Sequence, residues 1–506
     1  MSHPTAVEAE LARRRRRPLR WLLRLLALGV AVAVLVALLA GLRLLGSGTP
    51  LYRGEVAHFR YGSIGSEVPS GIPARVWHAL PRLYPDAFAG RDDYAAFGFL
   101  YAGDRPGSPA LPIGIAERER LGVDLVWFNC AVCHVGTYRE AEAAAPVLVD
   151  GMPSNKLDLG GFIDFLLSIA DDPRMAPGPL MAAMEEAGVG LGPLDRAIWR
   201  VAVFPQLREG LVEQAAALQP LMARQPDWGR GRVDTFNPYK VLEFGIPADS
   251  LTEAEVIGAS DFPSIFLQGP REGMWLHWDG NNDSLAERNL SAALGAGVTP
   301  ASVDHRAVQR VAAWLTDLAP PPSPHAPDPE AVARGRPAYM EHCAACHGYQ
   351  GEDGYVFEGD KLGTVEPIAT LGTDPARHDS YTQAFAERQK AELFAGTPHA
   401  FRRFRKTDGY ANAPLDGLWL RGPYLHNGSV PTLADLLAPP AERPVRFRRD
   451  SDVIDPRGGF VSPACAPGTE GCFDTTLPGN SNAGHLYGTD LTAAETADLL
   501  AYLLTF

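Results

Sequence analysis

The sequence predicts a mainly α-helical fold of two tandem domains with long loops, preceded by a transmembrane helix. Three observations lead to this prediction. The motif Cys-x-x-Cys-His occurs at residues 130–134 and again at 343–347, and a helical pattern follows each copy further along the chain. Few segments alternate apolar and polar residues as half-buried strands do. The 44 Pro and 51 Gly residues suggest that much of the chain lies in loops.

The first segment, residues 1–46, is predicted to be a cytoplasmic basic tip and a membrane anchor. Arg13 to Arg17 are consecutive positive charges, and the uncharged apolar run Leu25–Leu42 follows them. A helix over this run would be roughly 27 Å long, close to the thickness of a bilayer core. A cleaved signal peptide would export the chain equally well, but no clear small-x-small cleavage site precedes Arg43. We therefore expect an uncleaved anchor, with the remaining residues outside the cytoplasm.

Charge divides the chain in the same way. The net charge is −14, and residues 1–46 carry eight Arg and two Glu, so the remainder carries −20. An acidic surface argues against nucleic acid as a partner. It allows steering toward a basic redox partner, and simple solubility explains it equally well.

Each Cys-x-x-Cys-His copy indicates covalent attachment of a c-type haem. Two thiols add to the two vinyl groups of one porphyrin, and the adjacent His becomes the proximal iron ligand. A lone Cys-x-x-Cys could be a redox pair or half of a zinc site. Two copies, each with its own His, are harder to explain in that way. We predict two haems, the first held by Cys130, Cys133 and His134 and the second by Cys343, Cys346 and His347.

The attachment chemistry also bears on location. It normally takes place outside the cytoplasmic membrane, so we expect haem domains in the periplasm, tethered to the cytoplasmic (inner) membrane. The two remaining cysteines, Cys465 and Cys472, lie in a loop rich in Pro and Gly. In an oxidising compartment we expect them to form a disulfide, since a metal site would lack further ligands nearby.

The predicted domains follow from helical patterns. Residues 47–318 form an elaborated first haem domain, 319–329 a Pro-rich linker, and 330–506 a second cytochrome c-like haem domain. A helix closes each domain. In the first, apolar residues recur at helical spacing before Pro320; in the second, Thr492 and Glu495 form a capping box. Another helix leads into the second motif.

The sixth ligand of each iron separates an electron carrier from a catalyst, because an open position admits O₂ or peroxide. No Met follows Cys343, so the second domain cannot supply Met from its downstream sequence. His is the alternative, and the downstream candidates are His378, His399, His426 and His485.

A resemblance narrows these candidates. The segment Gly422–Leu433, with sequence GPYLHNGSVPTL, resembles the signature of the dihaem cytochrome c peroxidase superfamily. Other segments resemble its rubber-oxygenase-like branch, namely 277–282, 287–292, 418–420 and 479–485. The resemblance covers most of residues 110–506. Where the peroxidases carry a Met ligand, this chain has Pro439 and Pro440, which favours the rubber-oxygenase-like pattern.

The resemblance implies roles for two histidines. His485 would be the distal ligand of the second haem iron. His426 would order the loop near that haem or lie between the two haems. For either histidine, an ordinary surface or loop His is the alternative. In such proteins one haem transfers electrons and the other reacts with peroxide or O₂.

The first haem is less determined. His277, beside Trp278, could be a sixth ligand, a distal acid or base, or a residue that supports a ligand. Trp278 could help electrons pass between the haems, but core packing is the commoner role of such a residue. Asp279–Asp283 begins like a calcium loop, yet it lacks the following Gly and the closing Glu, so we expect a turn.

Two functions remain open from the sequence. The first is a haem-dependent oxidoreductase of the peroxidase or oxygenase type, with a reactive first haem and an electron-transferring second haem. The second is a non-catalytic electron-transfer cytochrome in which both irons are six-coordinate. The partners would be a redox protein or another electron donor and, for the enzyme, a small oxidant. The predicted anchor argues against an insoluble external polymer as substrate.

Overall fold

The computed structural model describes residues 21–31, 34, 38, 48–102 and 110–506. About 40% of the described residues are helical and 12% are in strands, so the prediction of a mainly α fold is wrong. The described strands form six antiparallel sheets, one with three strands and five with two. Most of these strands have only three or four residues, too few for an alternating pattern to be visible in the sequence.

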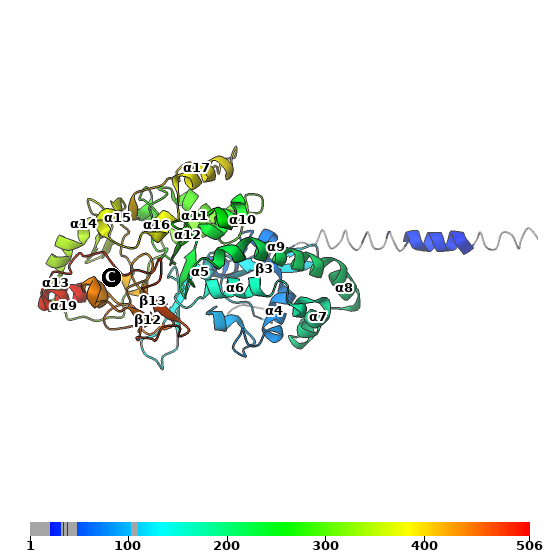
Figure 1. The fold of residues 1–506 in the computed structure, drawn as a ribbon, viewed down its shortest axis with the longest axis horizontal. Coiled ribbons are helices and arrows are strands. Elements are labelled where there is room, and N and C mark those ends of the chain that lie inside the picture. The colour runs from blue at the N-terminus through cyan, green and yellow to red at the C-terminus, as the bar shows by residue number, and fades with distance from the viewer. Residues whose placement is uncertain (1–20, 32–33, 35–37, 39–47, 103–109) are drawn as a thin grey trace, which may run out of the picture.

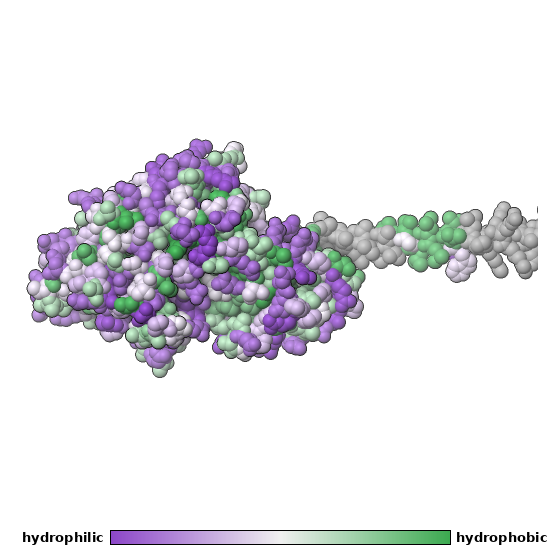
Figure 2. Space-filling view, viewed as in Figure 1, coloured by the Kyte–Doolittle hydropathy of each residue, from purple (hydrophilic) through white to green (hydrophobic). Residues whose placement is uncertain are grey.

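The described residues do not support the predicted membrane-spanning helix. Within the described part of the chain, no helix is long and apolar enough to cross a membrane. Residues 21–31 are helical and exposed (Figure 2). The arginine cluster and most of the other predicted anchor residues lie outside the described residues, which omit 1–20, 32–33, 35–37 and 39–47.

The first motif belongs to the part of the molecule drawn in blue, cyan and green in Figure 1. Its helices are α2 (Glu55–Tyr61), α3 (Glu67–Ser70), α4 (Ala74–Leu83), α5 (Ala131–His134), α6 (Leu159–Ser168), α7 (Pro177–Glu186), α8 (Pro193–Ile198) and α9 (Phe204–Met222). Its strands are β1 (Ile72–Pro73), β2 (Ile115–Arg120), β3 (Val123–Phe128), β4 (Val135–Tyr138) and β5 (Val147–Asp150). The three-stranded sheet has the order β1-β3-β2, and the pair Ile115 and Phe128 sets the register of β2 and β3.

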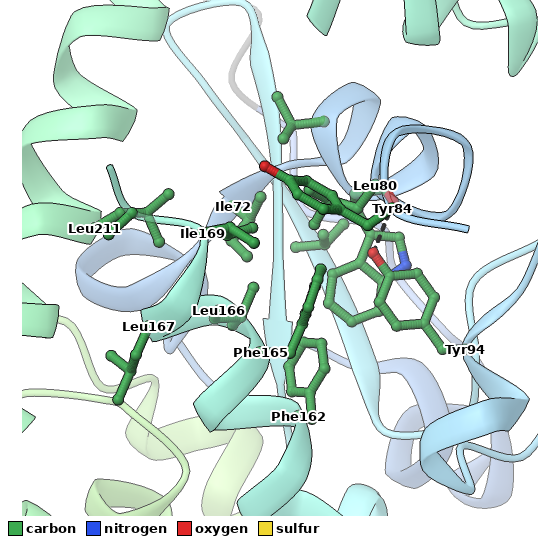
Figure 3. Close-up of a cluster of buried hydrophobic side chains, with 14 of the residues drawn as sticks. Ile72, Leu80, Tyr84, Tyr94, Phe162, Phe165, Leu166, Leu167, Ile169 and Leu211 are labelled. Carbon is green, nitrogen blue, oxygen red and sulfur yellow. Dashed lines mark hydrogen bonds between the residues drawn. The ribbon is translucent and has the colours of Figure 1, made fainter. Parts of the chain in front are cut away.

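An aromatic core fills this part. Phe162 and Phe165 extend from α6 toward Tyr84 and Tyr94 (Figure 3). Tyr94 is buried, and its hydroxyl donates a hydrogen bond to the carbonyl of Trp77 at 2.7 Å. A buried phenol needs such a partner, because an unpaired hydroxyl in an apolar core is costly.

Between the two motifs lie further helices and one small sheet. These are α10 (Asn237–Phe244), α11 (Leu285–Gly295) and α12 (His305–Leu315), with strands β6 (Arg232–Asp234) and β7 (Ala259–Asp261). The helix predicted before Pro320 is α12; Asp304 caps its N-terminus by accepting from two backbone N–H groups. It ends at Leu315, five residues before the first proline.

The second motif follows the helix α13 (Pro329–His342) and forms α14 (Ala344–His347). The C-terminal helix α19 (Ala493–Leu503) packs along α13 (Figure 1), and the predicted capping box of Thr492 and Glu495 is present. The helices approach closely: a Cβ on Gly335 would lie 1.9 Å from the carbonyl oxygen of Asp498. The other helices of this region are α15 (Ile368–Leu371), α16 (Ala376–Asp379), α17 (Gln383–Glu392) and α18 (Leu433–Leu436). Its strands are β8 (Tyr349–Gly351), β9 (Gly354–Val356), β10 (Val365–Pro367), β11 (Gly409–Ala411), β12 (Arg446–Arg448) and β13 (Cys472–Asp474).

The two motifs are therefore not set in repeated units of one design, as the prediction of tandem domains required. The first motif follows the strand β3, whereas the second follows the long helix α13. The two helices that were predicted to close the domains also pack differently, because α12 packs on α2 and α11, whereas α19 packs on α13.

One hydrophobic cluster joins residues from both halves of the chain, and we call it the shared core. Phe236, Tyr239 and Leu290 come from before the Pro-rich segment, and Tyr381, Phe385 and Phe401 come from after it. Tyr381 and Phe236 have ring centroids 4.6 Å apart. The domain boundaries at 46, 318 and 329 stay predictions, but the packing does not separate the chain at residue 319.

The predicted disulfide between Cys465 and Cys472 is confirmed. It joins the loop before β13 to the first residue of that strand. The other four cysteines, all in the haem motifs, form no disulfide.

Candidate functional site

The first motif is held by the residue that precedes it. The Asn129 side chain accepts from the N–H of Ala131 at 2.9 Å and donates to the carbonyl of Gly62 at 3.0 Å. This fixes the turn from β3 into α5, so that Cys130, Cys133 and His134 follow on one short helical turn. His134 Nδ1 lies 3.0 Å from the carbonyl oxygen of Pro263.

The second motif has the same local design. His347 Nδ1 lies 2.8 Å from the carbonyl oxygen of Ala413. A carbonyl can only accept, so Nδ1 carries the proton and Nε2 is left as a lone-pair donor. Metal-binding histidines are generally oriented in this way. The donor sets at both motifs, two thiols and one oriented imidazole each, thus fit covalently held haems.

His485 faces His347 across a cavity. Their ring centroids are 6.4 Å apart. A metal–imidazole bond is about 2 Å long, so an iron between two facing imidazoles would hold ring centres about 6 Å apart. Burial, together with the charges of His347 and Arg443, lowers the pKa of His485 to about 4. Burial also lowers the pKa of His347. Both rings are therefore neutral, as ligation requires.

The cavity has a volume of about 280 Å³ and brings together most of the predicted site residues. Cys343, Cys346 and His347 line it together with the three predicted histidines His277, His426 and His485. Most of the remaining lining is apolar or aromatic. Cys130, Cys133 and His134 do not line it, but Pro263, which accepts from His134, does.

Of the four downstream histidines considered for the second iron, two are engaged elsewhere. Both ring nitrogens of His378 have partners, Asp379 at 2.8 Å and the carbonyl of Thr407 at 2.9 Å. His399 stacks on His305 with centroids 3.7 Å apart and does not line the cavity. Only His426 and His485 remain.

His426 lies in the hairpin that resembles the superfamily signature, where Tyr424 and Val430 pair. It is buried and stacks on Tyr410 with centroids 4.1 Å apart. Its Nε2 atom is buried without a hydrogen-bond partner, and burial lowers its pKa to about 3. A buried, unpaired ring nitrogen at a cavity wall suits contact with a bound group. His347 and His485 already oppose each other, so the structure gives no support to His426 as a ligand of the same iron.

His277 stands in a tight turn closed by the pairing of Leu276 with Asn282. Its φ angle is +63°, a conformation that costs energy for a residue with a side chain. Its Nδ1 lies 2.5 Å from Asn281 Oδ1, so its Nε2, like those of the proximal histidines, is left as the lone-pair donor. Burial lowers the pKa of His277 to about 4, and Arg288 adds to this.

The residues after His277 form a turn. Buried Asp279 lies 3.4 Å from Arg377, and the described residues contain no group of His, Cys, Asp and Glu side chains suited to a metal ion. Trp278 lines the cavity, and its indole N–H donates to the carbonyl of Asp261 at 2.8 Å.

Two arginines were missed by sequence reasoning. Arg288 lines the cavity, and its positive charge acts on Cys130, His134 and His277. Arg443, whose side chain is buried, donates to the carbonyl of His485 and to those of residues before it. The segment 287–292, which contains Arg288, was part of the resemblance noted above. No sequence signal marks Arg443, because its partners are backbone atoms.

Comparison with known proteins agrees with a cytochrome. Residues 409–448 match the family described as "RoxA-like, cytochrome c-like". This stretch holds β11, the hairpin with His426, and Arg443. It supports a c-type cytochrome of the rubber-oxygenase-like kind, in which haem is implied.

Two curated relatives come from Sinorhizobium fredii (strain NBRC 101917 / NGR234). "Uncharacterized protein y4iM" is 29% identical over 45% of this chain, and the match spans 56% of its own length. "Uncharacterized protein y4iJ" is 27% identical over 83% of this chain and 85% of its own length. Their descriptions state no activity.

Proposed function

We propose that this chain is a dihaem c-type cytochrome that acts as an oxidoreductase, with unequal roles for its two haems. Cys343 and Cys346, together with His347 and His485, would hold the second haem, which would transfer electrons. Cys130, Cys133 and His134 would hold the first haem, which would react with O₂ or peroxide. The observation that carries the proposal is the pair of facing imidazoles at 6.4 Å beside the second motif.

The asymmetry between the motifs supports the division of roles. Among the described residues, no imidazole makes a comparable ring contact with His134. An iron with one strong axial ligand leaves a position for a small oxidant, whereas two imidazoles close the iron and lower its reduction potential relative to His/Met.

The protein's own contribution near the first motif would be orientation and charge. When bound, the haem supplies one-electron and oxygen chemistry. Pro263 holds the His134 ring, and Asn281 holds His277 with its Nε2 able to accept a proton. Arg288 is a cation with its pKa lowered by burial to about 10, so it stays charged at neutral pH and favours negative charge in this part of the cavity.

Location and partner are part of the same proposal. Covalent haem attachment normally occurs outside the cytoplasmic membrane, and the Cys465–Cys472 disulfide belongs to an oxidising compartment. We place the protein in the periplasm. The residues after 46 carry a net charge of −20, which suits a redox partner with a basic face.

The test is a titration of the purified haem-loaded protein with carbon monoxide after reduction. Denatured protein in pyridine should give two c-type haems per chain. Native protein should bind about one carbon monoxide per two haems, while the other haem keeps the spectrum of a low-spin bis-imidazole iron. Binding at neither haem would refute a reactive first haem, and binding at both would refute the closed second haem.

A second function is supported by His277. Its Nδ1 is held by Asn281, in the same manner as the Nδ1 atoms of the proximal histidines, so its Nε2 is available to a metal. If His277 ligates the first iron, the protein is an electron-transfer cytochrome with two closed haems. The carbon monoxide titration separates the two functions, because this one requires no binding at either haem.

A further inference from the structure

His485 sits in a segment that has little regular structure to hold it. Residues 479–485 contain neither helix nor strand. His485 itself has a φ angle of +50°, directly after Gly484 at +74°. A residue with a side chain pays an energetic penalty in this conformation, which persists only where the surroundings hold it. The backbone N–H of His485 donates to the carbonyl of Leu371 at 2.8 Å, which secures one side of the residue.

Arg443 secures the other side. Its Nη1 donates to the carbonyls of Asn482 at 2.6 Å and Gly484 at 2.9 Å. Its Nη2 donates to the carbonyl of His485 at 3.3 Å. The remaining donors reach back to the end of α18, to Leu436 and Ala438. All five N–H bonds of the guanidinium can be used, and every acceptor is a backbone carbonyl.

These contacts join two segments far apart in the chain. One set of acceptors lies at and just after the end of α18, and the other lies in the His485 segment. Arg443 is only 3% exposed, so water cannot replace the lost hydrogen bonds freely if its side chain is removed. A lysine carries the same charge but cannot reproduce a planar five-donor fork.

We propose that Arg443 is the positioning residue for the sixth ligand of the second haem. It holds the carbonyls of residues 482, 484 and 485 so that the His485 ring stays opposite His347. This inference rests on the proposed function, since it presumes that His485 is that ligand. The positive charge of Arg443 near the site also disfavours the oxidised iron. It therefore keeps the reduction potential of the second haem higher than two imidazole ligands alone would.

Arg443→Lys and Arg443→Met, made in the full-length haem-loaded protein, test the proposal. Both should release the His485 segment and raise carbon monoxide binding at the reduced second haem about tenfold, the factor expected for losing one to two net hydrogen bonds. Both should add a high-spin signal to the oxidised spectrum. Only Arg443→Met should also lower the potential of the second haem, because Arg443→Lys keeps the charge.

Arg224→Lys is the matched control. Arg224 also donates to two backbone carbonyls, those of Ala248 and Leu251, but neither of these partners lines the cavity, whereas His485, a partner of Arg443, does. Its variant should lose stability without any change in spin state or carbon monoxide binding. If the Arg443 variants lose stability and keep a fully low-spin second haem, Arg443 contributes only to stability and the proposal is overturned. If the wild-type second haem is already high-spin, the proposed function itself is at fault.

Discussion

Trp278 and Asp261 connect the turn that carries His277 to the hairpin that carries His426. The indole N–H of Trp278 donates to the Asp261 carbonyl at 2.8 Å, and the Asp261 N–H donates to the His426 carbonyl at 2.9 Å. Trp278 and His426, which lie on distant segments, are thus both hydrogen-bonded to the same residue of β7. Trp278 is oriented by its hydrogen bond and lies at the wall of the cavity.

Trp278→Phe tests whether this connection matters for the first haem. The variant keeps an aromatic ring but leaves the Asp261 carbonyl unpaired, which should cost about 1–2 kcal/mol in urea unfolding. The variant should also change the rate at which carbon monoxide binds to the first haem. Trp228→Phe is the control, since Trp228 donates to Gln225 away from the cavity lining. Equal carbon monoxide rates in both variants would show that Trp278 only packs.

His485→Gly should open the second iron. Removing the ring that faces His347 leaves one axial imidazole, so the oxidised second haem should turn from low-spin to high-spin. Added imidazole should restore the low-spin spectrum by filling the space of the lost ring. His399→Gly, a change at a histidine outside the cavity, should leave the spectrum as in wild type. An unchanged spectrum in His485→Gly would remove His485 as the ligand.

His277→Ala distinguishes the two proposed functions. If the first haem is reactive and open, its spin state should not change, but turnover with peroxide or O₂ should fall at least tenfold because a proton acceptor is lost. If His277 is a sixth ligand, the first haem should turn high-spin. Electron paramagnetic resonance of the oxidised protein detects the change of spin state, and an assay with peroxide or O₂ detects the loss of turnover. A variant with wild-type turnover and a wild-type spectrum would contradict both roles.

Asp452 should make stability depend on pH. It is fully buried and accepts from Thr137 at 2.7 Å, Arg139 at 2.7 Å and Lys156 at 2.9 Å. Burial acts to raise its pKa, but these hydrogen bonds prevail and lower it from 3.8. A carboxylate with a lowered pKa stabilises the fold fully above its unfolded pKa and loses this effect as the pH falls through the folded value.

The variant Asp452→Asn should therefore cost about 3 kcal/mol of unfolding free energy at pH 7. The difference from wild type should stay constant down to about pH 5 and shrink below about pH 4. Urea unfolding at several pH values measures it. A difference that grows on acidification would mean that the carboxyl is protonated in the folded state at neutral pH.

Gly335→Ala and Gly210→Ala should have opposite effects on stability. A Cβ at 335 would meet the Asp498 carbonyl at 1.9 Å, so α13 and α19 would have to separate. The cost should exceed about 2 kcal/mol. Nothing lies within 4 Å of a Cβ at 210, so alanine within α9 should stabilise by about 0.5–1 kcal/mol. Thermal unfolding measures both, and two changes of the same sign would contradict the close packing.

Local patterns predicted the parts of the site that depend on neighbouring residues. The two Cys-x-x-Cys-His copies, the capping box at Thr492 and the disulfide of Cys465 could be read because their partners lie a few residues away. The absence of Met after Cys343 reduced the choice of ligand to His, and resemblance then pointed to His485. The structure adds the facing ring of His347, which no spacing could supply because residues 347 and 485 meet only in the fold.

The remaining features depend on contacts that leave no pattern. The short sheets are too brief to show a period of two, so the strand content was underestimated. Arg443 binds backbone carbonyls, which every residue has, and Arg288 acts by charge through the cavity. The membrane helix was inferred from hydropathy, the arginine cluster and the lack of a clear cleavage site, and the described residues contain no helix long and apolar enough to cross a membrane.

The shared core packs Phe236 and Tyr239 against Tyr381 and Phe385, which lie on the other side of the Pro-rich segment in the chain. This side-chain packing would fix the spacing of the two proposed haem sites. Electron tunnelling is steeply sensitive to separation, so a rigid spacer gives a constant rate, whereas a flexible tether gives a spread of rates. Inserting glycines at residue 322 in the Pro-rich segment should therefore not change the kinetics, and electron transfer between the haems should stay single-exponential. Neither half should be expressible alone as a well-folded protein, since its half of that aromatic interior would face water.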